Sequence, residues 1–248
     1  MRIPRRLLLL LPLAAVPPAR AGQVRVAVAA NLVQAMQEIT RGFAQASGHQ
    51  AQLVPGSTGK FYAQIRNGAP FEVLLAADQE TPARLEGQGL AVTGTRFTYA
   101  TGRLALWSAR PGLVDGDAVL RRPPAGPLAI ADPRVAPYGA AARQVLQRLG
   151  LLAAWQPHLV QGESIGQAFQ FVASGNAPLG FVALAQVMAG GRLTSGSAWT
   201  VPARLHQPLR QDAVLLAGGR GNPAAEALLQ YLRGDAARAV LRAHGYQV

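Results

Sequence analysis

Short apolar runs alternate with amphipathic segments along most of the chain. The period-two pattern of residues 24–28 predicts a strand, and the helical spacing of apolar residues from Leu32 to Phe43 predicts a helix that begins at Asn31 and ends at Gly48. Further strands are predicted at residues 52–54, 71–76, 104–107, 128–131, 179–182 and 212–216, and further helices at 58–67, 80–88, 139–149, from 165 onward and at 224–244. This alternation indicates an α/β fold.

One local arrangement recurs four times: a strand, a short polar or Gly/Pro loop, and then a helix start. It occurs at Asn31, Thr58, Tyr138 and Ile165. In open α/β sheets such helix N-termini gather at the carboxyl ends of the strands, where ligands bind. The first backbone N–H groups of each helix lack intrahelical partners and carry the positive end of the helix dipole. The pattern therefore predicts a site for an anion.

The segment Gly56-Ser57-Thr58-Gly59-Lys60 is the strongest of these four corners, since it joins two hydroxyls, two glycines and the only lysine of the chain. A nucleotide-binding P-loop requires G-x-x-x-x-G-K-[ST]. Here Val54 occupies the position of the first glycine and Phe61 follows the lysine. We therefore expect an oxyanion near Ser57 and Thr58, and a solvated Lys60.

The first 21 residues have the pattern of an export signal. Three arginines precede the apolar run Leu7–Val16, and Ala19-Arg20-Ala21 supplies a cleavage site. The apolar run is shorter than the roughly 20 residues that span a bilayer. General secretion and the twin-arginine route both remain open, because Arg5-Arg6 precede the leucines without a full twin-arginine pattern. We expect an exported, periplasmic protein.

Charge and composition narrow the function further. The formal net charge of +12 includes four arginines of the leader and falls to +8 without them. The other basic residues are scattered and form no aromatic-interleaved stripe, so nucleic acid is not an expected partner. The chain has no cysteine, which excludes disulfides and thiolate metal sites. Its four histidines (His49, His158, His206 and His244) lie far apart and are expected at the surface.

An ordered set of segments resembles the periplasmic molybdate-binding proteins that supply molybdate ABC transporters. Each segment is a weak signal alone, but their order and spacing extend over nearly the whole mature chain. The matching segments are Val28–Leu32, Gly56–Ile65, Asn67–Val73, Ala76–Gln79, Ala131–Pro133, Pro137–Gly139 and Asn176–Gly180.

The resemblance implies a two-lobed periplasmic binding protein of class II, with the ligand in the cleft between lobes joined by crossing strands. Carried over here, residues 1–21 form the signal peptide, residues 22–103 plus 206–248 form lobe 1, and residues 104–205 form lobe 2. It also implies a monomeric binding protein without catalysis or cofactor, whose partners are the oxyanion and a membrane permease.

The family's ligand positions fall on five residues of this chain: Asn31, Ser57, Thr58, Tyr138 and, through its backbone N–H, Ile165. Asn31 occupies a position where some members have serine. Ala183 occupies a position where some members have a tyrosine that contacts the oxyanion, and those same members have alanine in place of Tyr138. The match is to the branch with Asn in the first loop and Tyr in the third. The resemblance implies that molybdate binds through these residues, with no direct metal-ion ligand.

The chemistry of these five positions is consistent with that expectation. Molybdate and tungstate are dianions without protons, so they need hydrogen-bond donors and no acceptor. Hydrogen phosphate carries a proton and favours a carboxylate acceptor, and none of the five residues is acidic. Asp78 and Asp132 are expected as caps or hinge groups. Sulfate is also a dianion, so a sulfate-binding or broader oxyanion-binding transport protein remains an alternative.

Two other classes remain open. An exported hydrolase with Ser57 as nucleophile would need a base, but no G-x-S-x-G motif is present and no histidine can be assigned to that role. A basic module that binds polyanions at the cell surface would show a steep dependence of binding on salt.

Overall fold

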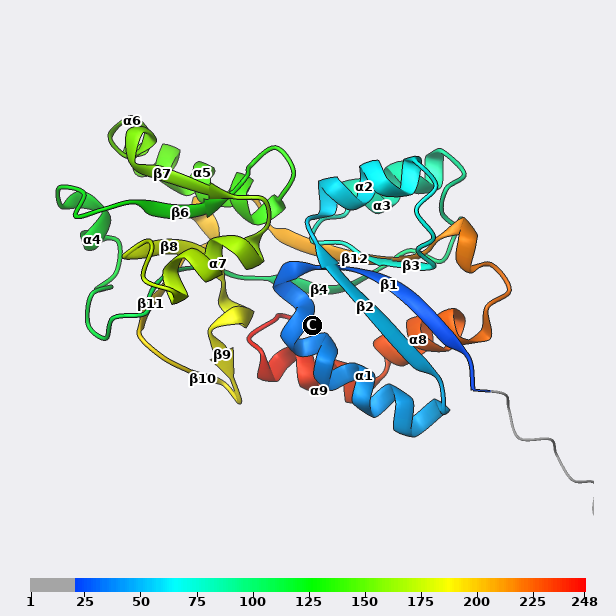
Figure 1. Cartoon of the computed structure of the whole chain (residues 1–248). Helices are drawn as coiled ribbons and strands as arrows, with labels where there is room; N and C mark the ends of the chain where they lie inside the picture. The colour runs from blue at the N-terminus through cyan, green and yellow to red at the C-terminus, as the bar shows by residue number, and fades with distance from the viewer. Residues whose placement is uncertain (1–20) are drawn as a thin grey trace, which may run out of the picture.

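The computed structural model describes residues 21–248, and the predicted export signal at 1–21 lies outside this range except for Ala21. The described chain folds into two α/β lobes placed side by side (Figure 1). Each lobe is built around one five-stranded sheet with helices on both faces. Among the described helices, none is long and apolar enough to cross a membrane.

Lobe 1 contains the sheet with the strand order β2-β1-β3-β12-β4. The strands β1 to β3 are parallel, and β12 runs antiparallel to both of its neighbours. The strand bounds are β1 Gln23–Ala29, β2 Gln50–Gly56, β3 Val73–Leu75, β4 Phe97–Gly102 and β12 Leu209–Leu215. The helices of this lobe are α1 Val33–Ser47, α2 Thr58–Arg66, α3 Glu80–Gly87, α8 Pro223–Arg233 and α9 Asp235–Ala243, and the 3₁₀ helix η1 Ala30–Leu32 precedes α1.

Lobe 2 contains the sheet with the order β11-β5-β8-β6-β7, in which β6 is parallel to β7 and β8. Its strands are β5 Leu104–Ser108, β6 Leu128–Ala131, β7 Leu159–Gly162, β8 Leu179–Ala183 and β11 Ser197–Thr200, and a small ribbon is formed by β9 Met188–Ala189 and β10 Arg192–Leu193. Its helices are α4 Ala118–Arg121, α5 Pro137–Arg148, α6 Leu152–Trp155 and α7 Ile165–Ala173. Three 3₁₀ turns of this lobe are η2 Gln156–His158, η3 Leu184–Gln186 and η4 Ala203–Leu205, and a further one, η5 Ala217–Gly219, follows β12 in lobe 1.

The chain crosses between the two sheets twice, first between β4 and β5 and again between β11 and β12. The parallel strands of both sheets point their carboxyl ends toward the other lobe (Figure 1). The loops that follow β1, β2, β6 and β7 therefore meet between the lobes, which is where this class of sheet places its ligands.

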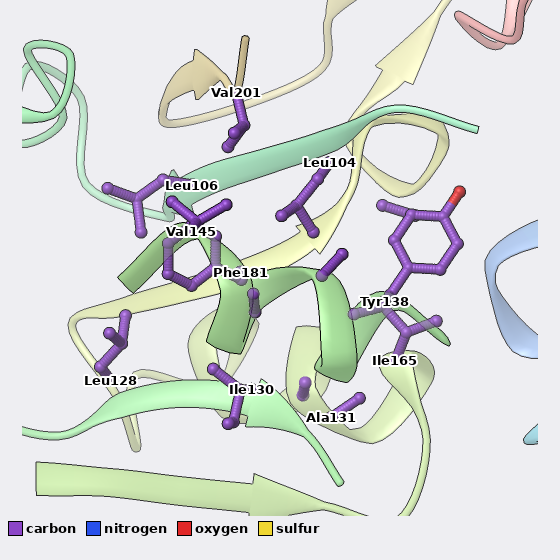
Figure 2. Close-up of a cluster of buried hydrophobic side chains, with 14 of the residues drawn as sticks. Leu104, Leu106, Leu128, Ile130, Ala131, Tyr138, Val145, Ile165, Phe181 and Val201 are labelled. Carbon is purple, nitrogen blue, oxygen red and sulfur yellow. The ribbon is translucent and has the colours of Figure 1, made fainter. Parts of the chain in front are cut away.

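Apolar side chains fill both faces of each sheet. Phe43 and Met36 of α1 pack with the strands on one face of the lobe 1 sheet, and Phe61 and Ile65 of α2 pack on the other. In lobe 2, the largest cluster joins α5 to β5, β6 and β8 (Figure 2). Tyr138 borders this cluster, and its hydroxyl group points away from the apolar residues. Burial of these faces is the main stabilising contribution to each lobe.

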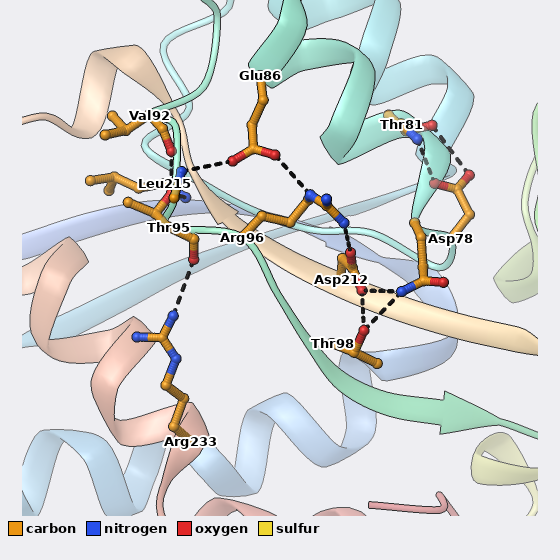
Figure 3. A network of polar contacts seen from close by, with 12 residues as sticks. Asp78, Thr81, Glu86, Val92, Thr95, Arg96, Thr98, Asp212, Leu215 and Arg233 are labelled. Atoms are coloured by element: carbon orange, nitrogen blue, oxygen red, sulfur yellow. Dashed lines mark hydrogen bonds and ion pairs between the residues drawn. The ribbon is translucent and has the colours of Figure 1, made fainter.

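A β-bulge at Gln211 and Asp212 interrupts the pairing of β12 with β4. Asp212 is fully buried, and its carboxylate accepts hydrogen bonds from Arg96 Nη1 at 2.7 Å and Thr98 Oγ1 at 2.6 Å (Figure 3). Arg96 also pairs with Glu86 at 2.7 Å. A buried carboxylate is tolerated only with such partners. The network therefore fixes β12 at the point where it approaches lobe 2.

The structure corrects three sequence predictions. Asn31 does not cap α1, because it lies inside the 3₁₀ helix η1 and its side chain makes no capping bond. No strand was predicted from the sequence at β4, β7, β9, β10 or β11. His49, His206 and His244 are buried rather than superficial. The sequence could not show their partners, which are distant in the chain for His49 (Gly22 N) and His244 (Glu38).

Candidate oxyanion site

All five predicted site residues line one small cavity between the lobes. Lobe 1 supplies Asn31 from η1 together with Ser57 and Thr58 from the start of α2, and lobe 2 supplies Tyr138 and Ile165. Each of the five residues is at most 4% exposed. The remaining lining residues are small or apolar: Ala29, Ala30, Gly56, Ala77, Ala136 and Pro137. The cavity is thus lined without any charged side chain.

The cavity is compact. Its volume of about 10 Å³ is close to what one water-sized sphere requires. It adjoins a larger open groove of about 610 Å³, with which it shares the wall residues Ala77, Ala136 and Pro137. Any guest larger than a water molecule therefore requires the walls to move apart, and the closed cavity has no room for a sugar or a nucleotide.

The hydroxyl group of Ser57 is the clearest sign of a ligand. Ser57 has the extended backbone of an N-cap residue, yet its side chain does not cap α2. Its Oγ is buried and has no hydrogen-bond partner within the described residues. Leaving a buried hydroxyl unpaired costs about 1–3 kcal/mol, and such a group in a native structure needs an explanation. A polar guest in the cavity supplies one.

Thr58 has a structural role in addition to lining the cavity. Its Oγ1 accepts a hydrogen bond from the backbone N–H of Ala77 at 2.9 Å, which ties the start of α2 to the loop after β3. Because the oxygen acts as the acceptor, the hydroxyl proton of Thr58 is still available to donate. One side chain can therefore hold the site together and contact the guest.

The helix starts add backbone donors. Thr58, Tyr138 and Ile165 all lie in the first turn of their helices, where N–H groups have no intrahelical acceptor. The N-terminal ends of α2, α5 and α7 thus converge on the cavity, and their dipoles favour negative charge there.

The Tyr138 hydroxyl group is hydrogen-bonded to Gln211, which does not line the cavity. The phenol oxygen accepts a hydrogen bond from Nε2 of Gln211 on β12 at 3.0 Å. Burial raises the pKa of Tyr138 above that of an exposed tyrosine, so the phenol stays protonated. The side-chain amide of Asn31 is engaged in the same region: Nδ2 donates to Gln211 Oε1 and to Tyr246 OH, both at 2.9 Å. No pattern in the sequence points to Gln211 or Tyr246.

The two lobes touch at the rim of the cavity. Gly59 N donates to Val135 O at 2.9 Å, and the Lys60 ammonium pairs with the Glu163 carboxylate. A side chain at position 59 would place its Cβ 2.9 Å from Val135 Cα, so only glycine permits this approach. Lys60 is 44% exposed and does not line the cavity. The structure therefore shows the lobes closed over the site.

Asp78 and Asp132 have the structural roles predicted for them. Asp78 accepts hydrogen bonds from the N–H and the hydroxyl group of Thr81, which lies in the first turn of α3. Asp132 accepts from Arg134 N at 2.9 Å and pairs with the Arg134 guanidinium, which lowers the pKa of Asp132. Within the described residues, no group of three or more histidine, aspartate or glutamate side chains could hold a metal ion.

Residues 24–247 match the family of bacterial extracellular solute-binding proteins, and the chain belongs to this family. The chain is 56% identical over 229 residues to the molybdate-binding protein ModA of Azotobacter vinelandii, covering 92% of this chain and 91% of the relative. It is 47% identical over 229 residues to ModA of Rhodobacter capsulatus, covering 92% and 90%. A solved structure of the periplasmic molybdate-binding protein of Azotobacter vinelandii superposes with a TM-score of 0.87 at 42% identity, covering 91% of this chain and 99% of that one.

Proposed function

We propose that this protein captures molybdate, and tungstate with it, in the periplasm and delivers it to the permease of an ABC transporter. It acts as a monomer, without catalysis and without a cofactor. The observation that carries the proposal is the uncharged cavity between the lobes, where the buried Ser57 hydroxyl lacks a partner and three helix starts converge. The 56% identity to a molybdate-binding protein supports the choice of ligand.

The donors expected at the site suit a dianion. Ser57, Thr58, Tyr138 and Ile165 line one cavity, so we expect the hydroxyl groups of the first two and the first-turn N–H groups of the last three to donate to a shared guest. Hydrogen bonds to a charged acceptor contribute roughly 1.5–3 kcal/mol each. No carboxylate lines the cavity, so a protonated oxyanion finds no carboxylate acceptor there.

Two lobes that close on the ligand account for its capture and release. We take lobe 1 as residues 22–103 plus 206–248 and lobe 2 as residues 104–205, because the two chain crossings fall at these boundaries. The closing contacts at Gly59 and Lys60 lie at the rim, so parting the lobes would expose the cavity. A permease can then receive the ligand from the opened protein.

The hydrolase hypothesis receives no support from the site. A serine nucleophile requires an adjacent base. The residues that line the cavity include no histidine, lysine, aspartate or glutamate. Ser57 is therefore assigned to ligand binding.

Thermal unfolding with four oxyanions tests the proposal. Molybdate or tungstate at about 100 times its Kd should raise the free energy of unfolding by roughly 2.7 kcal/mol, whereas equal concentrations of sulfate and phosphate should have a much smaller effect. Calorimetric titration then gives the affinities. The absence of stabilisation by both molybdate and tungstate contradicts the proposal, and equal stabilisation by sulfate would favour a broader oxyanion carrier.

A further inference from the structure

A buried polar network lies beneath the cavity, where the crossing strands join the lobes. Its five side chains come from distant parts of the chain, and none is more than 5% exposed: Asn31, Tyr99, Tyr138, Gln211 and Tyr246. Two of them, Asn31 and Tyr138, also line the cavity. The network therefore links the ligand site to the strands that connect the lobes.

Gln211 is the centre of this network. Its Oε1 lies 2.9 Å from Asn31 Nδ2 and 2.8 Å from the Tyr99 hydroxyl, and its Nε2 lies 3.0 Å from the Tyr138 hydroxyl. The residue is fully buried at the bulge of β12, beside the anchored Asp212. One amide thus joins a site residue of lobe 1 to a site residue of lobe 2.

In this first arrangement of the network, some hydrogen-bond donors and acceptors have no matching partner. Asn31 Nδ2 uses both of its protons, on Gln211 and Tyr246, while Asn31 Oδ1 is buried without a donor within the described residues. Tyr99 has one proton but two acceptors in reach, Ala76 O at 2.9 Å and Gln211 Oε1 at 2.8 Å. The Tyr138 phenol accepts from Gln211 and has its own proton to spare.

A second arrangement uses the same heavy-atom positions with the oxygen and nitrogen ends of both amides exchanged. Gln211 Nε2 then donates to Asn31 Oδ1 and to the Tyr99 oxygen, and Tyr99 gives its single proton to Ala76 O. Tyr138 donates its proton to Gln211 Oε1. Asn31 Oδ1, Tyr99 and Tyr138 now each have a partner, while the single proton of Tyr246 faces two acceptors, Asn31 O and Asn31 Oδ1.

Exchanging the amide ends of Asn31 and Gln211 changes which hydrogen-bond donors are available to an anion in the cavity. In the first arrangement both Nδ2 protons of Asn31 are engaged in the network. In the second arrangement Oδ1 accepts from Gln211, the single Tyr246 proton is shared between Oδ1 and the Asn31 backbone carbonyl, and Nδ2 occupies the former place of the unpartnered oxygen. An amide N–H then becomes available to the guest, and an unpaired acceptor is removed.

We propose that Gln211 is a positioning residue, which turns the Asn31 amide so that its nitrogen faces the bound oxyanion. Binding of the anion selects the second arrangement, and the change passes through Gln211 to the Tyr138 hydroxyl of the opposite lobe. This inference rests on the proposed function and adds to it a residue that does not itself touch the ligand.

Side-chain amide resonances of ¹⁵N-labelled protein test this directly. Saturating molybdate should shift the NH₂ signals of both Asn31 and Gln211, which are assigned by their loss in Asn31→Asp and Gln211→Glu. The signal of Gln52, an exposed residue of β2, should not move. If the parent protein binds molybdate but the Gln211 signal stays in place, the inference is wrong. A parent that binds no molybdate contradicts the proposed function itself, and this inference with it.

The Gln211→Glu variant adds a second readout. A protonated glutamic acid still donates one proton to Asn31, but an ionised carboxylate presents only acceptors. Its molybdate affinity should therefore be at least tenfold below that of the parent at pH 8.5 and should recover as the pH falls to 6. The parent should show no such slope, because burial raises the pKa of Tyr99 and Tyr138, the phenols that contact Gln211.

Gln52→Glu is the matched control, since it adds the same charge at an exposed site. Its affinity should stay within twofold of the parent at every pH. A Gln211→Glu variant that is folded and binds molybdate as tightly as the parent at pH 8.5 would contradict the positioning role. If this variant does not fold, the resonances of the parent protein decide the question alone, with the Gln211 signal identified by backbone-to-side-chain correlation.

Discussion

Ser57 and Ser164 occupy equivalent places and have different roles. Each follows a strand of its lobe and stands immediately before a helix, α2 or α7, with an extended backbone. Ser164 Oγ accepts a hydrogen bond from Gln167 N at 3.3 Å and caps its helix. Ser57 Oγ caps nothing and is buried without a partner within the described part of the chain. A serine that precedes a helix without capping it is therefore a candidate for binding a ligand.

The surroundings of the two serines explain the difference. Ser57 is 4% exposed and faces the closed contact between the lobes, while Ser164 is half-buried. Two polar residues close to Ser57, namely Thr58 and Lys60, have roles of their own. Thr58 Oγ1 accepts a backbone hydrogen bond in addition to lining the cavity, and the Lys60 ammonium pairs with Glu163 of the other lobe. The same short segment therefore contains the proposed ligand-binding hydroxyl of Ser57, a structural hydrogen bond of Thr58 and a rim contact of Lys60, which substitutions can separate.

Ser57→Ala should have the largest effect on binding. Loss of a hydrogen bond to a dianion should reduce molybdate affinity by roughly 1.5–3 kcal/mol, as measured by calorimetry. The melting temperature of the ligand-free protein should stay the same or rise, because an unpaired buried hydroxyl is removed. A variant with unchanged affinity would show that Ser57 does not contact the ligand.

Thr58→Val should instead reduce the stability of the ligand-free protein. The variant keeps the shape of the side chain but leaves the buried Ala77 N–H without an acceptor, which costs about 1–3 kcal/mol in denaturant unfolding. Thr58→Ser retains the oxygen and should recover most of this loss. Equal stability of the valine variant and the parent would contradict the structural role of Thr58.

Ser164→Ala should lower stability by about 1 kcal/mol through loss of the cap. Its molybdate affinity should remain within a few-fold of the parent, in contrast to Ser57→Ala. Ser164→Asn serves as the control, since asparagine is an equally good capping residue. A loss of affinity as large as that of Ser57→Ala would remove the distinction between the two serines.

The Lys60–Glu163 pair should have the smallest effect. Both side chains are largely exposed, and exposed pairs contribute about 0.2–1 kcal/mol. A double-mutant cycle with Lys60→Ala and Glu163→Ala should give a coupling in this range for the release rate of molybdate, and added salt should reduce it. The exchanged pair Lys60→Glu with Glu163→Lys should retain the coupling. A coupling above 2 kcal/mol would mean that the pair, rather than the cavity, controls closure.

The local features of the fold could be predicted from the sequence. The alternation at 24–28 indicated β1, the helix predicted from 165 onward corresponds to α7, and the repeated helix starts indicated where the predicted site residues would meet. The partners of these residues could not be predicted. Gln211 and Tyr246 lie 180 and 215 positions from Asn31, and no local pattern records contacts over such separations.

The place of β12 in lobe 1 affects how this protein folds. This late strand is inserted between β3 and β4, which precede it by more than a hundred residues, and it joins them on both sides. The sheet of the first lobe is therefore incomplete until nearly the whole polypeptide is available. Contacts of such high sequence separation form slowly. A nascent chain that is still being synthesised thus lacks the strand that would complete its first lobe, and stable folding is postponed to the end.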